Sequence, residues 1–373
     1  MPSAGKTQKK IDSARLHARS ELKTAAHWSK GGHAARGPLH QLLPPCPENI
    51  PRAHCRDLSQ EAFVERFESP GLPCVIDGLT EGTQCAERWT REQLVARFKH
   101  ERFKVGEDDK GYNVKLKMKH FDRYLQDQAK TDDSPMYLFD SKLGEANGTM
   151  SLLDDYTVPP YFSEDLFALA GERRRPPYRW FIMGPERSGS GIHTDPLATS
   201  AWNMLVAGHK RWCVFPPGVR GSDVKPRSGE DNEAVTWFTK VMPRTAHLER
   251  YDFIQRPGET VYIPGNWWHV VLNLDETIAV TQNFTSSTNF AQVWDKTSRS
   301  RPKLSVKWLA ALDEQRPDLA QLARQQLSAC KVCRGQPSWE KHEKHKHHTP
   351  RDATKRALAE TDTRARGGKQ ARR

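Results

Sequence analysis

Two β-rich segments that lie far apart in the chain, residues 188–215 and 257–284, constrain the fold most strongly. The first carries His193 and Asp195, and residues two apart on an extended chain project from the same face. The second carries His269 within the run Trp-Trp-His-Val-Val. Two imidazoles and one carboxylate form the facial triad that binds non-haem Fe(II) and leaves coordination positions open. A fold that brings these segments together would therefore build a metal site.

A His-x-Asp pair alone is weak evidence, because such pairs are common in proteins without a metal there. The residues that follow strengthen the interpretation. Residues 201–206 and 210–215 are mostly apolar and flank a short turn, which predicts a β-hairpin with Asn203 and Lys210 on one face. A lysine on an otherwise apolar face is costly unless an anion meets it. The alternative is that its stem extends along the apolar surface and the ammonium reaches water at the turn.

A second hairpin is predicted from residues 269–273 and 277–283. If the three residues between them form the loop, His269 lies opposite Thr281. A two-residue loop would shift the register by one and place Thr281 on the other face. The sequence leaves both registers open.

These residues in this order resemble a known family. His-x-Asp is followed by Asn203, Lys210, the string Pro-Gly-x-x-x-x-Ile-Pro-x-x-Trp-Trp-His (257–269) and Thr-Gln-Asn-Phe (281–284). The chain is thereby identified as similar to the Jumonji C family of Fe(II)- and 2-oxoglutarate-dependent oxygenases. Within that family it most resembles the bifunctional arginine demethylases and lysyl hydroxylases once described as a phosphatidylserine receptor. Three further strings carry this resemblance: residues 175–181, 208–213 and 286–290.

The resemblance implies a role for each matching residue, with O₂ as the third small reactant. The implied iron ligands are His193, Asp195 and His269. The residues implied around 2-oxoglutarate are Lys210 and Thr281 on its distal carboxylate, with Asn203 and Tyr137 beside them. The substrate is expected to contact Trp180 and Ser190, where Ser190 stands in place of the threonine usual in the family.

The predicted fold is mainly β with flanking helices. Successive strands with turn signals, preceded by helices, favour a double-stranded β-helix, a cupin-like jelly roll with N-terminal α/β decoration and C-terminal helices. We expect a basic, largely disordered arm over residues 1–55, the catalytic domain over 56–290, helices over 291–328 and a basic, His-rich disordered tail over 329–373. In the resembled subfamily the C-terminal helices pair two chains. From periodicity alone, packing on the chain's own barrel is equally compatible.

Positive charge is concentrated at the two ends of the chain. Residues 1–40 contain eight Lys/Arg and two Asp/Glu, residues 331–373 contain thirteen and five, and the remainder is nearly neutral. Basic ends of this kind are typical of nuclear localisation or RNA contacts, although a solvated tail without a ligand has the same composition. No apolar run approaches the roughly 18 residues that span a membrane, and no signal peptide is recognisable. We therefore expect a nuclear protein without membrane contact.

The tail carries one further cluster that could bind zinc. Two thiols and two imidazoles suffice for a tetrahedral site. The alternative is a basic tract without a metal, since the spacing is short for a zinc finger and lysines surround the histidines. The residues concerned are Cys330, Cys333, His342, His345, His347 and His348.

The expected function is that of a protein oxygenase acting on lysine side chains of histone tails or Arg/Ser-rich splicing factors, with demethylation of N-methylarginine as a second outcome. A basic substrate would favour acidic groups near the mouth of the site, for which four residues are available: Asp132, Asp133, Asp231 and Glu233. One alternative is a cupin-fold oxygenase acting on RNA or a small molecule. Another is a catalytically silent scaffold that binds nucleic acid or splicing proteins.

Overall fold

The computed structural model describes residues 4–142 and 148–329. The chain divides into two compact units. The first comprises the residues up to Leu166 together with Arg175–Asn289, and the second comprises Phe167–Arg174 together with the chain from Phe290. Within the described residues, no helix has both the length and the apolar character that crossing a bilayer requires.

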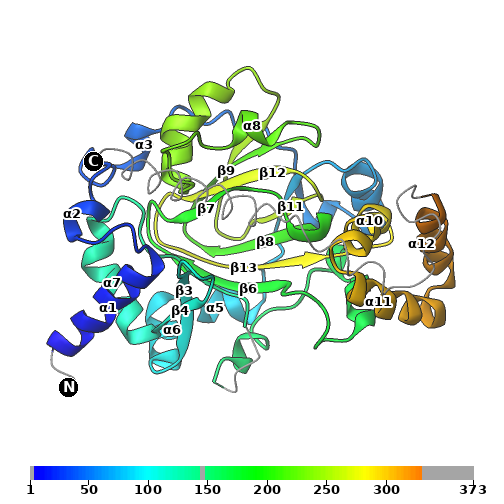
Figure 1. The fold of residues 1–373 in the computed structure, drawn as a ribbon, viewed down its shortest axis with the longest axis horizontal. Helices are drawn as coiled ribbons and strands as arrows, with labels where there is room; N and C mark the ends of the chain where they lie inside the picture. The colour runs from blue at the N-terminus through cyan, green and yellow to red at the C-terminus, as the bar shows by residue number, and fades with distance from the viewer. Residues whose placement is uncertain (1–3, 143–147, 330–373) are drawn as a thin grey trace, which may run out of the picture. The chain divides into compact units, whose positions relative to one another are not determined.

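The first unit is built on two facing β-sheets (Figure 1). Among the described residues the main sheet has seven strands in the order β1-β2-β11-β8-β13-β6-β5, and the second has four in the order β10-β9-β12-β7. The main-sheet strands are β1 (Arg52–His54), β2 (Cys74–Asp77), β5 (Leu138–Asp140), β6 (Arg179–Gly184), β8 (Ser200–Ala207), β11 (Thr260–Ile263) and β13 (Thr277–Phe284). The second-sheet strands are β7 (Gly189–His193), β9 (Lys210–Phe215), β10 (Tyr251–Gln255) and β12 (Trp268–Asn273).

Consecutive strands alternate between the two sheets. β6 and β8 belong to the main sheet while β7 and β9 belong to the second, and β10 to β13 alternate in the same way. This winding produces a double-stranded β-helix, the jelly roll of cupin-like proteins. The predicted fold class is therefore confirmed.

The two predicted hairpins are wrong in their strand pairing. β8 pairs with β11 and β13, whereas β9 pairs with β10 and β12, so the turn at Gly208 carries the chain from one sheet to the other. The loop between β12 and β13 has three residues, but those strands also lie in different sheets. The two corners contact each other, since a Cβ at Gly208 would lie 2.2 Å from the carbonyl oxygen of Glu276. Gly208 also has φ +79°, so glycine is required there on both counts.

Both faces of the central strands are buried, and their polar residues face inward. On β8, Trp202 and Met204 pack outward in the large hydrophobic core, while Asn203 projects to the inner face. β13 is buried along its whole length, with Ile278 and Val280 in the same outer core. Polar side chains on a buried inner face indicate a pocket between the sheets, because an apolar core would leave them without partners.

Helices cover the outer faces of both sheets. The outer face of the main sheet packs against N-terminal elements, and that of the second sheet packs against short helices that contribute Trp237 and Phe238. The N-terminal elements on the main sheet are α1 (Ala4–Ala18), α2 (Ala25–Trp28), α4 (Gln60–Phe63), α5 (Gln84–Arg88), α6 (Arg91–Phe98) and α7 (Met118–Gln126), with a two-stranded sheet of β3 (Arg102–Glu107) and β4 (Asn113–Lys117). Helix α3 (Leu39–Leu42) instead contributes Leu39 to the core on the second sheet. The helices beside the second sheet are α8 (Gly221–Val224), α9 (Ala234–Thr236) and the helical segment Trp237–Val241 that follows α9 directly.

The N-terminal arm, expected to be largely disordered, is folded from Ala4 onward. Helix α1 lies against β3, β4 and α7 (Figure 1) and contributes Ile11, with 1% of its surface exposed, to the large core. Trp28 is also in this core. The guanidinium of Arg15 forms a buried ion pair with Asp132 at 2.6 Å. The prediction of disorder rested on the basic composition of the arm. Composition does not reveal which few side chains are buried, so it did not indicate that Ile11, Arg15 and Trp28 hold the arm in place.

The buried ion pair between Arg15 and Asp132 yields a stability prediction. Arg15→Met would leave the Asp132 carboxylate, 1% exposed, with the Tyr124 hydroxyl but without its cation. Breaking a buried pair from one side typically costs about 3 to 5 kcal/mol, so we expect the free energy of unfolding in urea to fall by about that amount. The exposed pair Arg123–Asp127 provides the control, and Arg123→Met is expected to cost less than about 1 kcal/mol. Equal losses in the two variants would contradict the prediction.

The second unit is a helical cluster. Its helices are α10 (Phe290–Ser300), α11 (Pro302–Gln315) and α12 (Pro317–Ala329). Trp308 is fully buried and stacks on Phe167 with ring centroids 4.3 Å apart, while its contact with Trp294 joins α11 to α10. Apolar residues of these helices therefore pack on one another. Pairing of two chains through them stays a prediction.

Candidate metal centre

A pocket of about 220 Å³ lies between the two sheets. It is lined mostly by apolar and aromatic side chains, with a small number of polar groups that come from both sheets, as is typical of a small-ligand site. Each residue that the sequence predicted for the site lines this pocket: Tyr137, Trp180, Ser190, His193, Asp195, Asn203, Lys210, His269 and Thr281.

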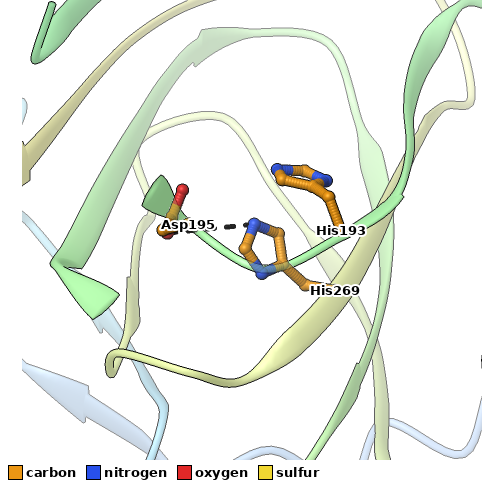
Figure 2. Close-up of side chains that lie close together, drawn as sticks. All are labelled: His193, Asp195 and His269. Atoms are coloured by element: carbon orange, nitrogen blue, oxygen red, sulfur yellow. Dashed lines mark ion pairs between the residues drawn. The ribbon is translucent and has the colours of Figure 1, made fainter. Parts of the chain in front are cut away.

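The three predicted metal ligands converge on one point (Figure 2). His193 ends β7, Asp195 follows it in extended conformation, and His269 lies on the neighbouring strand β12 directly opposite His193. Their candidate ligand atoms all lie within 4.8 Å of one another, and Asp195 Oδ2 is 4.0 Å from His269 Nε2. Among the described residues this is the cluster of histidine and carboxylate groups that could hold a metal ion.

Hydrogen bonds prepare both imidazoles for metal binding. His193 Nδ1 donates to the carbonyl of Gly191 at 2.7 Å, and His269 Nδ1 donates to the carbonyl of Trp267 at 3.0 Å. A carbonyl oxygen only accepts, so the proton is on Nδ1 and the lone pair of each Nε2 is free. Burial lowers the pKa of His269 to about 4, with the neighbouring His193 acting in the same direction, so His269 is neutral at pH 7.

The carboxylate of Asp195 supports the same conclusion. Its Oδ2 is buried and has no hydrogen-bond partner in the part of the chain that the structure describes. An unpartnered buried carboxylate oxygen is costly, and a cation bonded to it would remove that cost. Two imidazoles and one carboxylate with open positions match the donor set of non-haem Fe(II). The residues present therefore fit this metal.

A β-bulge places Ser190 in the pocket together with His193. In the ladder between β7 and β12, His193 lies opposite His269, but Ser190 lies opposite Val271, so β7 has one extra residue. Without the bulge, residues three apart on a strand would point to opposite faces. The extra residue brings both side chains to the inner face, whereas Ile192 packs outward.

Lys210 lines the same pocket and is fully buried. The ammonium does not reach water, so the extended-stem alternative is excluded. Its Nζ donates to Tyr137 Oη at 3.1 Å, to Asn273 Oδ1 at 2.8 Å and to Thr277 Oγ1 at 3.4 Å. Burial lowers the pKa of Lys210 to about 7, and the carboxylate of Asp275 opposes that shift. Among the residues that the structure describes, no carboxylate forms an ion pair with this ammonium, and a buried cation of this kind is expected where an anionic ligand binds.

Asn273 and Thr277 were missed by the sequence analysis. A signal for Asn273 was present, because it is four residues after His269 on the same strand and therefore on the same face. A polar residue there, in a strand of otherwise apolar residues, indicates a buried partner. Thr277 opens β13 in the same way, four residues before Thr281.

Thr281 and Asn203 lie directly opposite each other on β13 and β8, with Trp180 next to Thr281 on β6. The Thr281 hydroxyl donates to the carbonyl of Trp202 at 2.6 Å. In this rotamer its oxygen can accept a hydrogen bond but cannot donate one to a carboxylate. Asn203 Oδ1 is buried without a partner among the described residues, so it is available to a ligand that donates.

Three aromatic side chains line one wall of the pocket. Tyr137 contacts Phe139 with ring centroids 5.8 Å apart, and Phe139 contacts Trp180 at 5.7 Å. Such a wall suits the aliphatic stem of a long cationic side chain. Trp180 therefore occupies the kind of position predicted for a substrate contact.

The four acidic residues considered for the mouth of the site bond to other parts of the chain, and Asp231 accepts a hydrogen bond from the backbone of Glu233. Asp132 pairs with Arg15, Asp133 accepts hydrogen bonds from the backbone of Gly32 and Ala34, and Glu233 pairs with Arg19. In the described part of the chain, Asp195 is the one carboxylate that lines the pocket. The proposed zinc ligands Cys330 and Cys333, with the tail histidines, lie outside the described residues.

The pKa of Lys210 leads to a pH prediction for the binding of 2-oxoglutarate. A carboxylate ligand requires the protonated ammonium, and the protonated fraction falls as pH rises through about 7. The apparent Kd should be nearly constant below this pH and should increase above it, approaching tenfold per pH unit. Calorimetric titration of the Mn(II)-loaded protein at several pH values measures this, with metal saturation checked at each. A Kd that stays constant well above pH 7 would contradict the prediction.

Comparisons with known proteins agree with this geometry. The family profile described as "JmjC domain, hydroxylase" matches residues 180–284. The chain is 42% identical over 332 residues to the bifunctional arginine demethylase and lysyl-hydroxylase psr-1 of Caenorhabditis elegans, which covers 86% of this chain and 81% of that relative. It is 38% identical to the arginine-specific demethylase JMJ22 of Arabidopsis thaliana, over 66% of this chain and 48% of the relative. It is 28% identical to the mouse 2-oxoglutarate and iron-dependent oxygenase JMJD4, over 62% of this chain and 60% of the relative.

Proposed function

This chain belongs to the JmjC family of Fe(II)- and 2-oxoglutarate-dependent hydroxylases, and we propose that it hydroxylates lysine side chains of basic nuclear proteins such as histones and splicing factors. Removal of N-methyl groups from arginine is the second reaction proposed for the same site. Two relatives are named as bifunctional arginine demethylases and lysyl-hydroxylases, which supports this pair of activities.

One observation carries the proposal. The converging imidazoles and carboxylate share a single pocket with a fully buried lysine ammonium. His193, Asp195 and His269 would hold the iron. Lys210 would receive the distal carboxylate of 2-oxoglutarate by a charge-assisted hydrogen bond, beside Tyr137. A pocket that combines a metal triad with a buried cation is suited to a dicarboxylate that contacts both.

Fe(II), 2-oxoglutarate and O₂ together supply the oxidation of a substrate C–H bond, with one oxygen atom going to the substrate and the other to succinate as CO₂ leaves. The protein's own residues bind, orient and exclude water. The apolar lining keeps water from the oxidising centre, and Trp180 and Phe139 would position the aliphatic stem of the substrate. The neutral His269 stays a ligand across the physiological pH range.

The same step has two outcomes that depend on the carbon attacked. Hydroxylation of a lysine side-chain carbon gives a stable alcohol. Hydroxylation of an N-methyl carbon gives a product that releases formaldehyde and leaves the nitrogen demethylated. The uncharged aromatic wall accepts either side chain, so the substrate peptide, rather than the wall, would decide between them.

The nuclear location and the basic partners rest on charge. Residues 331–373 contain thirteen Lys/Arg and five Asp/Glu, a composition typical of nuclear import signals and of segments that contact RNA. We propose that this segment directs the protein to the nucleus. Microscopy of the full chain and of a chain ending before residue 331 tests this, since loss of nuclear accumulation is expected only in the shortened chain.

Mass spectrometry of modified peptides tests the function. Purified protein with Fe(II), ascorbate and 2-oxoglutarate is incubated with a Lys/Arg-rich histone-tail peptide, an Arg/Ser-rich peptide, an acidic peptide and an RNA oligonucleotide. We expect succinate release stimulated by the basic peptides, and the added mass of one oxygen atom on their lysines. A peptide carrying N-methylarginine should release formaldehyde.

Two results would overturn the proposal. Stimulation by RNA with unmodified peptides would assign the chemistry to a nucleic-acid substrate. No succinate with any partner, from protein shown to bind Fe(II), would favour a scaffold without catalysis.

A further inference from the structure

Asn273 lies directly opposite Lys210 in the antiparallel ladder between β12 and β9. Directly opposed residues in such a ladder have neighbouring side chains on the same face. Asn273 is fully buried, and its backbone bonds on its other side to the corner between β6 and β7, through Arg187 N and Ser188 O. The backbone N–H and C=O of Asn273 are therefore both held by hydrogen bonds to this corner.

The hydrogen-bond network decides the orientation of the Asn273 amide. Ser188 Oγ donates its hydrogen to the carbonyl of Pro185 at 2.6 Å, so it can only accept from Asn273. Asn273 Nδ2 donates to Ser188 Oγ at 2.8 Å, which turns Oδ1 toward Lys210, also at 2.8 Å. The amide therefore presents a neutral acceptor to the ammonium in a fixed direction.

Asn273 stands behind the ammonium, while the pocket lies in front of it. Lys210 and Tyr137 line the pocket, but Asn273 and Thr277 do not. A lysine ammonium has three donors, and Asn273 Oδ1 is the nearest of its three acceptors. Tyr137 accepts from the ammonium, and its phenol also interacts with the side chain of Asn273. An incoming carboxylate can therefore take the longer contacts while Asn273 keeps its own.

We propose that Asn273 is a positioning residue for 2-oxoglutarate, which holds the ammonium of Lys210 toward the pocket from behind without contacting the ligand. This rests on the proposed function, because it assigns the distal carboxylate to Lys210. The position requires a neutral acceptor. A carboxylate there would pair with the ammonium and repel the dicarboxylate that has to bind it.

Asn273→Asp tests this requirement with almost no change in shape. We expect Kd for 2-oxoglutarate to rise by about tenfold or more, the loss typical when a hydrogen-bonded charged group is disturbed. The introduced carboxylate should also keep Lys210 protonated at higher pH, so Kd should no longer increase between one pH unit below and one above the pKa of Lys210. The other titratable groups near this lysine are the Tyr137 phenol, which also interacts with the Asn273 side chain, and the Asp275 carboxylate, and neither residue is replaced in the variant.

Asn273→Leu removes the acceptor without adding charge. It should weaken 2-oxoglutarate binding and leave the pH dependence in place. If Asn273 had a merely structural role, Asn273→Leu and Asn273→Asp would show the same pH dependence. Asn113→Asp adds the same charge at an exposed position on β4 and should behave as wild type. Calorimetry on the full chain measures the Kd for Mn(II) first and then the Kd for 2-oxoglutarate. The Mn(II) affinity should be equal in the wild type and the three variants.

The outcomes separate this inference from the proposed function. Wild-type protein that binds Mn(II) but no 2-oxoglutarate would overturn both. Binding of 2-oxoglutarate by Asn273→Asp with wild-type affinity and pH dependence would overturn the role of Asn273 alone. Parallel loss of Mn(II) and 2-oxoglutarate binding, together with a lower unfolding temperature in both Asn273 variants, would assign Asn273 to the fold instead.

Discussion

Replacing His193 and Asp195 together by alanine is expected to abolish the release of succinate from 2-oxoglutarate. The double variant retains one of the three converging side chains, His269, and a single imidazole does not hold a divalent ion in competition with water. Loss of a residue that only hydrogen-bonds to a metal ligand lowers the metal affinity about 10- to 100-fold. Loss of two ligands should therefore lower the Mn(II) affinity at least about 100-fold. Calorimetry with Mn(II) and a succinate assay measure the two effects.

The fold of this double variant should remain intact. Asp195 Oδ2 has no hydrogen-bond partner in the described chain, so its removal leaves no new buried group unsatisfied. Removal of His193 takes away its hydrogen bond to the carbonyl of Gly191, so the free energy of unfolding without metal is expected to fall by no more than about 0.5 to 1.5 kcal/mol. His247→Ala, at an exposed histidine, is the control and should retain both Mn(II) binding and succinate release. Succinate release that persists in the double variant would contradict the assignment of the metal site.

Lys210→Met should prevent 2-oxoglutarate from binding while the metal still binds. Methionine occupies a similar volume but provides no charge and no donor. Loss of one member of a buried, hydrogen-bonded charge pair costs about 2 to 5 kcal/mol of binding free energy, or roughly 30- to several-thousand-fold in Kd. Calorimetry on the Mn(II)-loaded protein measures this value directly.

A smaller 2-oxo acid isolates the contribution of the distal carboxylate. In the wild type, 2-oxoglutarate should bind far more tightly than pyruvate, which lacks that carboxylate. In Lys210→Met the two affinities should become similar. Lys240→Met, at an exposed lysine, should leave the preference unchanged. If 2-oxoglutarate kept its advantage in Lys210→Met, another residue would have to anchor the distal carboxylate.

The residues predicted for the site line one pocket, although the two strand pairings used to place them are wrong. Alternation along a strand showed that Asn203 and Lys210 face inward, and the structure agrees. Alternation does not show which sheet a strand joins. The inner faces of both sheets line one pocket. Asn203 and Lys210, which were predicted to share one face of a hairpin, therefore lie in the same pocket although they belong to different sheets. The same holds for His269 and Thr281.

Two parts of the structure were not predictable from local patterns. Helix α1 is basic, and Ile11 and Arg15 are buried only because β3, β4 and α7 lie against them. The orientation of Asn273 depends on Ser188, which is 85 residues away in the chain. Neither contact leaves a periodic signal, since each joins segments distant in sequence.

Local sequence determined the chemistry of the ligands: the two-residue spacing of His193 and Asp195, the histidine at position 269 and a lysine set among apolar neighbours. These follow from the geometry of a single extended chain, in which side-chain direction repeats every two residues. Only the tertiary structure decided that these groups converge, that the ammonium of Lys210 is fully buried and that Asn273 stands behind it. Those properties arise from the packing of two sheets, and the free energies of burial and hydrogen bonding there depend on neighbours that no local stretch contains.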